Sequence, residues 1–332
     1  MIKRVLITGA GGYIGCRLVE YLQDKGYEIK ALDRFYFGRE KLQKVLKGSG
    51  VELIEEDIRL FDPEILRDVD VVADLAALSN DPTGELDPVK TWSINYLGRF
   101  RVAVLSKIMG VKRYILPSSC SVYGFQEDVV SENSKVNPLT TYAKANYKAE
   151  VDIKRLAEDK FSVVILRFAT VYGYSLRMRF DLAINGMVKG FFKNGKIPIL
   201  RDGTQYRPFV HVMDVCKAIH LAMEAEDEKV KGEVFNVGSN EQNVQIFELA
   251  QRVAKAIGVE FNYEWYGLPD HRSYRVNFDK IREVLGFYPD YTIEDGAREI
   301  YNALKSGELN PDDPTTITVE WYKKLISEGV MV

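Results

Sequence analysis

The sequence is poor in residues that form disulfides or bind metals, with three cysteines and three histidines among 332 residues. Three scattered cysteines do not make a disulfide framework, and they favour a reducing compartment such as the cytoplasm. The histidines lack the paired spacing of metal ligands, so we expect no metal site. No apolar run approaches the roughly 18–20 residues of a membrane span, and the N-terminal residues fit a strand better than a cleavable signal. We therefore expect no membrane partner.

A large excess of charge of either sign is also missing. The formal net charge is −3, so the chain has no overall basic field to attract nucleic acid, and an anionic ligand must be bound by local groups. Hydrophobic residues make up 46% of the chain and charged residues 28%. Those are values of an ordinary globular protein, which excludes the disordered and fibrous classes.

Short β-rich runs alternate with longer helical patterns in the first half of the chain. Strands are predicted at residues 5–7, 28–32, 51–54, 69–73, 113–116 and 162–166, and helices through residues 18–22, 94–109 and 141–158. This alternation predicts an α/β fold with a parallel sheet and right-handed crossovers. After Gly173 the loops lengthen, and helices near 180–192 and 246–257, a strand at 234–237 and a final amphipathic helix follow. We expect this second part to be smaller and to cover a site on the first.

A glycine-rich turn, Thr-Gly-Ala-Gly-Gly-Tyr-Ile-Gly at residues 8–15, follows the first predicted strand directly and opens a helix. Gly9 permits a tight turn, Gly12 lets the backbone approach a pyrophosphate, and Gly15 lets helix and strand pack closely. The helix start, with Tyr13 and Ile14, offers free N–H groups and a positive dipole end to phosphates. The strand–turn–helix context predicts a dinucleotide site.

Asp33 ends the second predicted strand, about 20 residues after the turn, where such sites place an acidic residue. A carboxylate there hydrogen-bonds the adenosine ribose hydroxyls and repels a 2′-phosphate. NAD is therefore favoured over NADP, although the neighbouring Arg34 softens this preference.

Further segments resemble, in order, those of extended short-chain dehydrogenases of the NAD-dependent epimerase/dehydratase family. They are residues 8–15, Asp57 with Ile58, Leu75 with Ala76 and Ala77, Asn95, and residues 118–124, 166–173 and 207–214. The resemblance covers nearly the whole chain. It implies NAD as cofactor, with adenine contacts from Asp57 and Ile58, nicotinamide-ribose contacts from Leu75, Ala76 and Ala77, and a cofactor-binding role for Asn95.

The same resemblance implies a fold. We expect a Rossmann domain, a doubly wound parallel sheet with helices on both faces, in residues 1–173, with later segments at about 205–240 returning to it. Residues 174–332 then form mainly a smaller, mixed α/β substrate-binding domain. A homodimer through the two long helices around Arg99 and Asn146 is implied as well.

The family's catalytic group is a tyrosine with a lysine four residues later and a serine or threonine. Tyr142 and Ser119 match the base and hydroxyl positions, but Asn146 stands at the lysine position. A free tyrosine has a pKa near ~10, and a nearby ammonium and the oxidised nicotinamide favour the phenolate. Lys144 and Lys148 lie on other faces of the predicted helix. Asn146 could bind the nicotinamide ribose, but it supplies no charge.

This substitution leaves several interpretations open. In the one we prefer, Tyr142 works as a less activated base and the enzyme is slow or has a high pH optimum. In another, Tyr142 is not the sole base and the chemistry has shifted or been lost. A deliberately introduced substitution at Asn146 is a third.

The serine segment separates reaction types within the family. The 4,6-dehydratases carry an Asp-Glu pair where this chain has Cys120 and Ser121, and the decarboxylases usually carry Glu at the position of Ser121. A serine-rich segment resembles the 4-epimerases, so we count Ser121 with Tyr142, Ser119 and Asn146 as candidate catalytic residues. We interpret Cys120 as a small buried residue.

Local cations are needed for a substrate diphosphate. Arg207 and Arg272 match family positions that clamp it, and planar guanidinium groups suit phosphate oxygens. Arg179 could join them, while Thr170 stands where many relatives have an asparagine that contacts the nucleotide sugar.

The predicted function is therefore NAD-dependent epimerisation of a nucleotide-diphosphate sugar at C4, through a transient 4-keto intermediate. One alternative is a nucleotide-sugar ketoreductase or dehydrogenase with net turnover of the cofactor. Another is a catalytically weak protein that binds NAD and a nucleotide sugar, an alternative that rests on Asn146.

Overall fold

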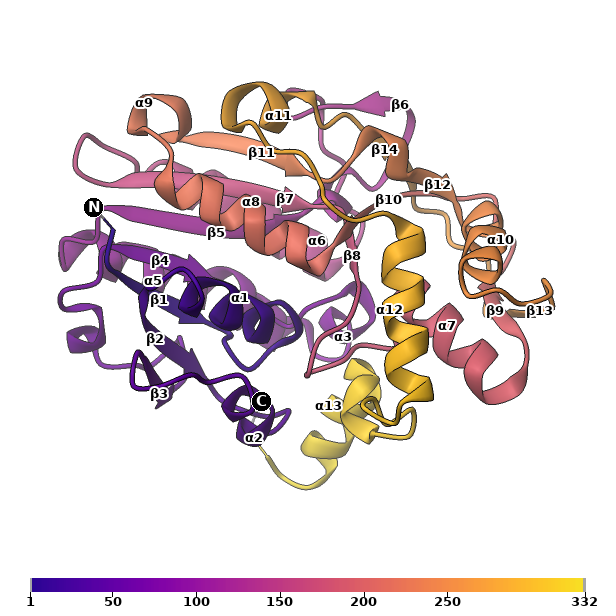
Figure 1. Cartoon of the computed structure of the whole chain (residues 1–332). Coiled ribbons are helices and arrows are strands. Elements are labelled where there is room, and N and C mark those ends of the chain that lie inside the picture. The colour runs from indigo at the N-terminus through magenta and orange to yellow at the C-terminus, as the bar shows by residue number, and fades with distance from the viewer. Residues whose placement is uncertain (1, 331–332) are drawn as a thin grey trace.

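The computed structural model describes residues 2–330 and has a seven-stranded parallel sheet at its centre (Figure 1). The strand order is β11-β7-β5-β4-β1-β2-β3. These strands are β1 (Arg4–Thr8), β2 (Glu28–Asp33), β3 (Val51–Glu55), β4 (Val71–Asp74), β5 (Arg113–Ser119), β7 (Ser162–Phe168) and β11 (Glu233–Val237). The chain reverses its direction of winding between β1 and β4, which is where ligands bind in sheets of this type. The predicted Rossmann-like α/β fold is confirmed.

Helices cover both faces of the sheet. α1 (Tyr13–Gln23) and α8 (Val212–Glu224) lie on one face, and α5 (Arg99–Ile108) and α6 (Thr141–Lys154) lie on the other. β1 shows the reason, because Val5 and Ile7 belong to the core under α1 and α8 while Leu6 belongs to the core under α5 and α6. Parallel strands are buried on both faces, so an unbroken apolar run is what such a sheet needs.

A second core lies beside the carboxyl ends of these strands. Its helices are α7 (Ala183–Asn194), α10 (Ile246–Ala256) and α12 (Ile293–Lys305). The short strands outside the central sheet are β6 (Phe125–Val130), β8 (Thr170–Tyr172), β9 (Ile197–Leu200), β10 (Tyr206–His211), β12 (Asn243–Gln245), β13 (Tyr263–Tyr266) and β14 (Ser273–Val276). They pair into one three-stranded and two two-stranded sheets. Between the two parts the chain crosses more than once, since α8 and β11 belong to the large sheet layer.

Several short helices complete the described chain. They are α2 (Arg39–Gln43), α3 (Asp81–Gly84), α4 (Pro88–Trp92), a π-helical turn (Ser93–Gly98), α9 (Asp227–Val230), α11 (Asp279–Leu285) and α13 (Thr318–Ser327). α13 returns to the loop after β2, where the Trp321 indole N–H donates to the Tyr36 carbonyl at 2.7 Å. The Tyr322 ring packs edge-on against Phe37, with ring centroids 5.4 Å apart. The C-terminal helix therefore ties the second part of the chain to the β2 end of the sheet.

The helix limits differ from the sequence prediction in three places. α6 ends at Lys154 instead of residue 158, and the helix predicted at 94–109 begins with the π-helical turn. α8 and α12 were not predicted. The buried apolar residues of both helices nevertheless recur at helical spacing. Within residues 2–330, no helix combines the length and apolar character that crossing a membrane requires.

Candidate functional site

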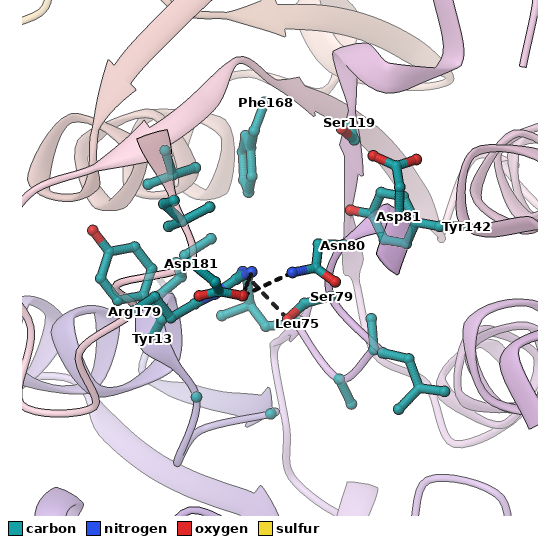
Figure 2. A pocket seen from close by; sticks show the side chains of 18 of the residues that line it. Tyr13, Leu75, Ser79, Asn80, Asp81, Ser119, Tyr142, Phe168, Arg179 and Asp181 are labelled. Carbon is teal, nitrogen blue, oxygen red and sulfur yellow. Dashed lines mark hydrogen bonds and ion pairs between the residues drawn. The ribbon is translucent and has the colours of Figure 1, made fainter. Parts of the chain in front are cut away.

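A cleft of about 590 Å³ runs along the carboxyl ends of the central strands. The residues that line it include most of the predicted site: Gly9, Gly12, Tyr13, Ile14, Gly15, Asp33, Asp57, Ile58, Leu75, Ala76, Ala77, Ser119, Ser121, Tyr142, Thr170, Arg179, Arg207 and Arg272. The glycine turn and the Tyr142 region therefore share one cavity. Figure 2 shows Tyr142, Ser119 and Asp81 grouped on one side of it and Tyr13 with Arg179 on the other.

Two glycines of the turn have no room for a side chain. Gly9 has a φ of +65°, and a Cβ there would lie 2.7 Å from the backbone of Leu75 and Ala76. A Cβ on Gly15 would lie 2.1 Å from the Gly9 carbonyl oxygen. The turn thus presses α1 against the ends of β1 and β4. The first N–H groups of α1 have no partner within the helix, and they face the cleft that Gly12 and Ile14 line.

The carboxylate of Asp33 supports the turn as well as lining the cleft. It accepts a hydrogen bond from Gly11 N at 3.0 Å and another from Phe35 N at 2.6 Å. Burial raises the pKa of Asp33, against the effect of these N–H groups. Asp57 lies nearby with its carboxylate paired to Arg59 at 2.7 Å. Burial alone would raise the pKa of Asp57, but hydrogen bonds and charge from Arg59 lower it overall.

Tyr142 and two serines meet at the other end of the cleft. Tyr142 lies in the first turn of α6, which the Thr140 hydroxyl caps by accepting from Ala143 N at 3.1 Å. Ser119 ends β5, and its hydroxyl accepts from Ser121 N at 3.1 Å. The Ser121 hydroxyl is buried and has no hydrogen-bond partner among the described residues. Ser121 therefore has a free hydroxyl at the wall of the cleft.

Some neighbours of Tyr142 raise the pKa of its phenol and others lower it. Burial and then the charge of Asp81 raise the pKa of Tyr142. The charge of Arg99 and hydrogen bonding with Ser119 and Asn146 lower it, and the net shift is upward. Lys144 is exposed and Lys148 pairs with Asp152 at 2.6 Å, so neither of these two lysines serves this site. Without bound cofactor, the protein therefore favours the neutral phenol of Tyr142 over the phenolate.

Two predicted cofactor ligands are placed differently. Asn95 is fully buried, and its carboxamide bonds both the N–H and the carbonyl of Leu78, at 2.9 and 3.0 Å. Asn146 is also buried, and its oxygen accepts from the Arg99 guanidinium at 3.2 Å. Neither lines the cleft. Asn95 fixes the loop after β4, and the oxygen of Asn146 is held by Arg99, so a direct contact of either side chain with the cofactor stays a prediction.

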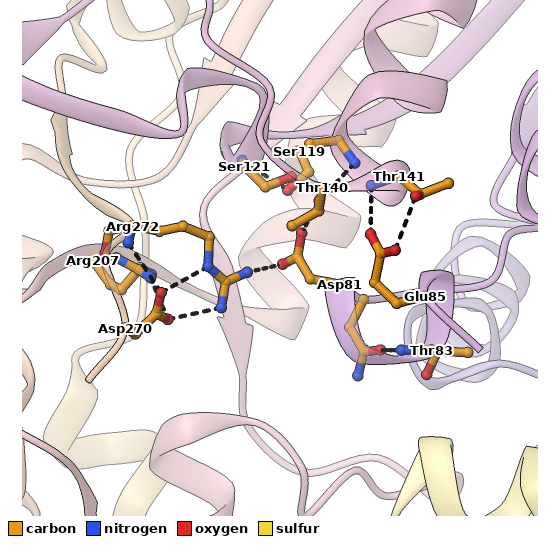
Figure 3. A network of polar contacts seen from close by, with 12 residues as sticks. Asp81, Thr83, Glu85, Ser119, Ser121, Thr140, Thr141, Arg207, Asp270 and Arg272 are labelled. Carbon is orange, nitrogen blue, oxygen red and sulfur yellow. Dashed lines mark hydrogen bonds and ion pairs between the residues drawn. The ribbon is translucent and has the colours of Figure 1, made fainter. Parts of the chain in front are cut away.

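Arg207 and Arg272 belong to a network of charges at the substrate end (Figure 3). Both bond Asp270, at 2.8 and 2.7 Å. Arg272 also pairs with Asp81, which in turn accepts from the Thr140 hydroxyl. Two guanidinium groups and two carboxylates face each other, so their charges balance. A diphosphate could use these arginines only by replacing a carboxylate partner.

The third predicted substrate arginine is similarly engaged. Arg179 makes two hydrogen bonds to Asp181, at 3.0 and 2.8 Å, and Asp181 also accepts from Asn80 at 2.8 Å. Figure 2 shows this group between the turn and Tyr142. Thr170, in β8, lines the cleft.

Sequence reasoning missed several residues of the cleft. Asp81 is the most consequential, since it acts on Tyr142 and holds Arg272. Its local pattern, an Asn80 cap followed by proline at the start of α3, predicts only a helix start. Tyr322, from α13, also lines the cleft. The contacts of both residues join segments far apart in sequence, which no local pattern reveals.

A reactive cysteine beside Ser119 and a metal site are two further features that such a cleft could contain. Cys120 is buried, its thiol faces the Arg167 carbonyl at 3.4 Å, and burial raises its pKa. That matches the interpretation of a small buried residue. No group of three His, Cys, Asp or Glu side chains within residues 2–330 is placed to hold a metal ion.

Comparison with known proteins identifies the family. The model of the NAD dependent epimerase/dehydratase family matches residues 5–238, well over half of the chain. The chain belongs to this family. It is 29% identical to a UDP-N-acetyl-alpha-D-glucosaminuronate decarboxylase of Bacillus cytotoxicus, covering 98% of this chain and 99% of that protein. It is 26% identical to a UDP-glucuronate 4-epimerase of Thermodesulfobacterium geofontis, covering 90% and 95%.

A solved structure of the family gives the same result. The UDP-glucuronic acid 4-epimerase of Bacillus cereus, in complex with UDP-glucuronic acid and NAD, superposes with a TM-score of 0.81 at 25% identity. The comparison covers 91% of this chain and 99% of that one. As in the family, the cofactor here is NAD.

The residues of the cleft fit this dinucleotide. Arg177 is 1% exposed and stacks on the Phe37 ring at 3.6 Å, and its Nε and Nη1 have no partner among residues 2–330. Burial and then the charge of Arg179 lower the pKa of Arg177 to about 10. Buried guanidinium donors without partners favour a ligand that brings acceptor oxygens. The phosphates of NAD would bring such oxygens, and the glycine turn would offer backbone donors to them.

Proposed function

We propose that this protein is an NAD-dependent nucleotide-sugar 4-epimerase. The observation that carries the proposal is one continuous cleft, with a dinucleotide turn at one end and Tyr142 with two serine hydroxyls and two arginines at the other. This arrangement suits a hydride transfer at one sugar carbon. Neither Cys120 nor Ser121 can do the acid–base work of a dehydratase pair.

When bound, NAD would supply the hydride acceptor and donor for C4 of the sugar, and the residues of this chain handle the proton and the orientation. Tyr142 takes the proton of the C4 hydroxyl as the hydride leaves, and it gives the proton back in the reverse step. Ser119 holds the reacting oxygen, and the free hydroxyl of Ser121 offers a further donor to the sugar. The 4-keto sugar must turn over between the two transfers, so its ring is held loosely while its diphosphate is held firmly.

The substrate that we propose is a UDP-linked sugar. The names of the relatives and of the solved neighbour all specify UDP sugars. We assign the diphosphate to Arg207 and Arg272, which reach it by exchanging Asp81 or Asp270 for phosphate oxygens. Decarboxylation is disfavoured because Ser121 stands where decarboxylases usually carry a glutamate. Arg179, held by Asp181, is assigned to shaping the wall of the sugar site.

A homodimer through the helices around α5 and α6 belongs to the proposal. Arg99 and Asn146 themselves point inward, each 2% exposed, so other residues of these helices must meet the partner. Leu97 and Ile108 are exposed by 56% and 70% and supply apolar surface there. Light scattering of the wild type and of Leu97→Asp tests this, and a wild-type monomer rejects it. The unpaired, buried cysteines suit the reducing cytoplasm, where we place the reaction.

The test is incubation of the purified protein with UDP-glucose, UDP-glucuronate and UDP-N-acetylglucosamine, each read by proton NMR. A 4-epimerase converts one of them to its C4 epimer without net change in the absorbance of reduced nicotinamide. A steady rise in that absorbance identifies a dehydrogenase and rejects the proposal. Binding of NAD and a UDP sugar without any product identifies a binding protein and rejects it as well.

A further inference from the structure

A buried arginine stands directly behind the catalytic cluster. Arg99, at the start of α5, is 2% exposed. Its Nη2 donates to the Asp74 carbonyl at 3.0 Å and to the Pro117 carbonyl, and its Nη1 donates to Asn146 Oδ1 at 3.2 Å. Its Nε has no hydrogen-bond partner among the described residues. Contacts from β4, β5 and α6 thus fix one cation in the core.

The contact between Arg99 and Asn146 sets which way the amide points. A guanidinium has only donors, so the Asn146 oxygen must face Arg99 and its NH₂ group must face elsewhere. Asn146 lies one helical turn after Tyr142 on α6, on the same face. Hydrogen bonding with Asn146 acts on the Tyr142 phenol. Arg99 therefore fixes the amide oxygen of Asn146 and leaves its NH₂ group to face other partners on this side of α6.

Other charged groups also act on Arg99 and on Tyr142. Asp74 is 3.7 Å from Arg99 Nε, and its carboxylate accepts from the hydroxyls of Thr8 and Tyr114. Burial raises the pKa of Asp74. Tyr142 itself is faced by Asp81 from α3, and it interacts electrostatically with Arg179 across the cleft.

We propose that Arg99 is a positioning residue that supplies, through Asn146, the positive charge behind Tyr142 that a lysine at position 146 supplies elsewhere in the family. The inference rests on the proposed function, because it assigns Tyr142 the role of base. It also explains how the site works without that lysine: the cation has moved from α6 to α5, and an amide bridges the gap. In this proposal Asn146 transmits the effect of the Arg99 charge to Tyr142, so its presence at the lysine position does not by itself inactivate the site.

The test compares Arg99→Met with Arg99→Met/Asn146→Lys and with a matched control, Arg113→Met. Arg113 is also buried, and it bonds two backbone carbonyls and the carboxylate of Asp227, away from the cleft. The phenol of Tyr142 is titrated by ultraviolet difference absorbance against Tyr142→Phe in each NAD-loaded background, and the kcat–pH profile is recorded on the same samples.

We expect Arg99→Met to shift the Tyr142 titration and the acid limb of kcat upward by about one pH unit, a roughly 10-fold smaller phenolate fraction below the pKa. KM for the UDP sugar should stay within about 2-fold, as expected when a transition-state interaction is lost. Adding the Asn146→Lys change to Arg99→Met should reverse most of the shift, and Arg113→Met should cause none. An Arg99→Met titration that coincides with the wild type, or a shift that the introduced lysine does not reverse, overturns the inference.

Two further measurements keep the test decisive. If Arg99→Met does not fold, Asn146→Leu interrupts the same chain while Arg99 remains, and it should produce the same upward shift; an unchanged titration overturns the inference. The phenol titration needs no turnover. If the titration shifts as stated but no UDP sugar is epimerised, the proposed function fails, although Arg99 still acts on the Tyr142 phenol. If a UDP sugar is epimerised but the titration does not shift, the proposed function holds and the Arg99 inference fails.

Discussion

Replacement of Gly9 by alanine tests whether the turn is built as described. Two effects add at this position. A φ of +65° is unfavourable for a residue with a Cβ, by roughly 1–2 kcal/mol. The new Cβ would also lie 2.7 Å from backbone atoms of Leu75 and Ala76, and overpacking against backbone costs typically about 1–3 kcal/mol. We expect a total destabilisation of about 2–5 kcal/mol.

Gly26 offers the matched control. Its φ is +86°, but nothing lies within 4 Å of a Cβ built there. Gly26→Ala should therefore lose only the conformational part, about 1–2 kcal/mol. Both variants are measured by urea unfolding after removal of NAD, so that bound cofactor does not alter the comparison.

The two variants should also differ in cofactor binding. Relief of the Gly9→Ala collision displaces Leu75 and Ala76, which line the cleft, so NAD affinity should fall by at least about 10-fold, or about 1.4 kcal/mol. Calorimetric titration with NAD measures this. If Gly9→Ala matches Gly26→Ala in both stability and affinity, then the turn is not packed against β4 as described, and the reasoning is refuted.

Three other changes have defined outcomes. Tyr142→Phe should lower kcat by at least about 100-fold while NAD stays bound, as turnover and released-nucleotide assays show; substantial residual turnover would exclude Tyr142 as the base. Asp81→Asn removes the carboxylate that raises the Tyr142 pKa, so the acid limb of kcat should move to lower pH. Asp270→Asn is its control, and an equal shift in both argues against a direct charge effect. Tyr322→Ala removes the ring contact with Phe37, worth roughly 0.5–1.5 kcal/mol, and should speed NAD release up to about 10-fold in a dilution assay; an unchanged rate means that α13 does not retain the cofactor.

The sheet and the turn could be predicted because their signals are local. Each buried strand is an apolar run, and residues 8–15 carry the turn, the close packing and the helix start within one segment. The family resemblance then placed Tyr142 and Ser119 in the same cleft, where the structure has them. Residues that are close in sequence, or that follow neighbouring parallel strands, can be arranged in only a few ways, so their positions can be predicted.

The remaining parts of the site depend on contacts between distant segments. Arg99 and Asn146 are 47 residues apart, and Asp81 and Arg272 are 191 apart. Asn146 alone predicts a missing charge, and only the packing of α5 against α6 reveals a guanidinium behind it. The bonds of Asn95 to the Leu78 backbone likewise leave no trace in the sequence pattern.

If Arg207 and Arg272 bind the diphosphate as we propose, their ion pairs with Asp270 and Asp81 limit which anions can bind there. A small anion such as inorganic phosphate would have to break an existing ion pair and could satisfy only part of what it disrupts. A diphosphate can bridge both guanidinium groups at once. The site would therefore distinguish anions by the distance between their phosphate groups and not by their charge. The affinity for the nucleotide sugar should then vary little with the salt concentration of the cell.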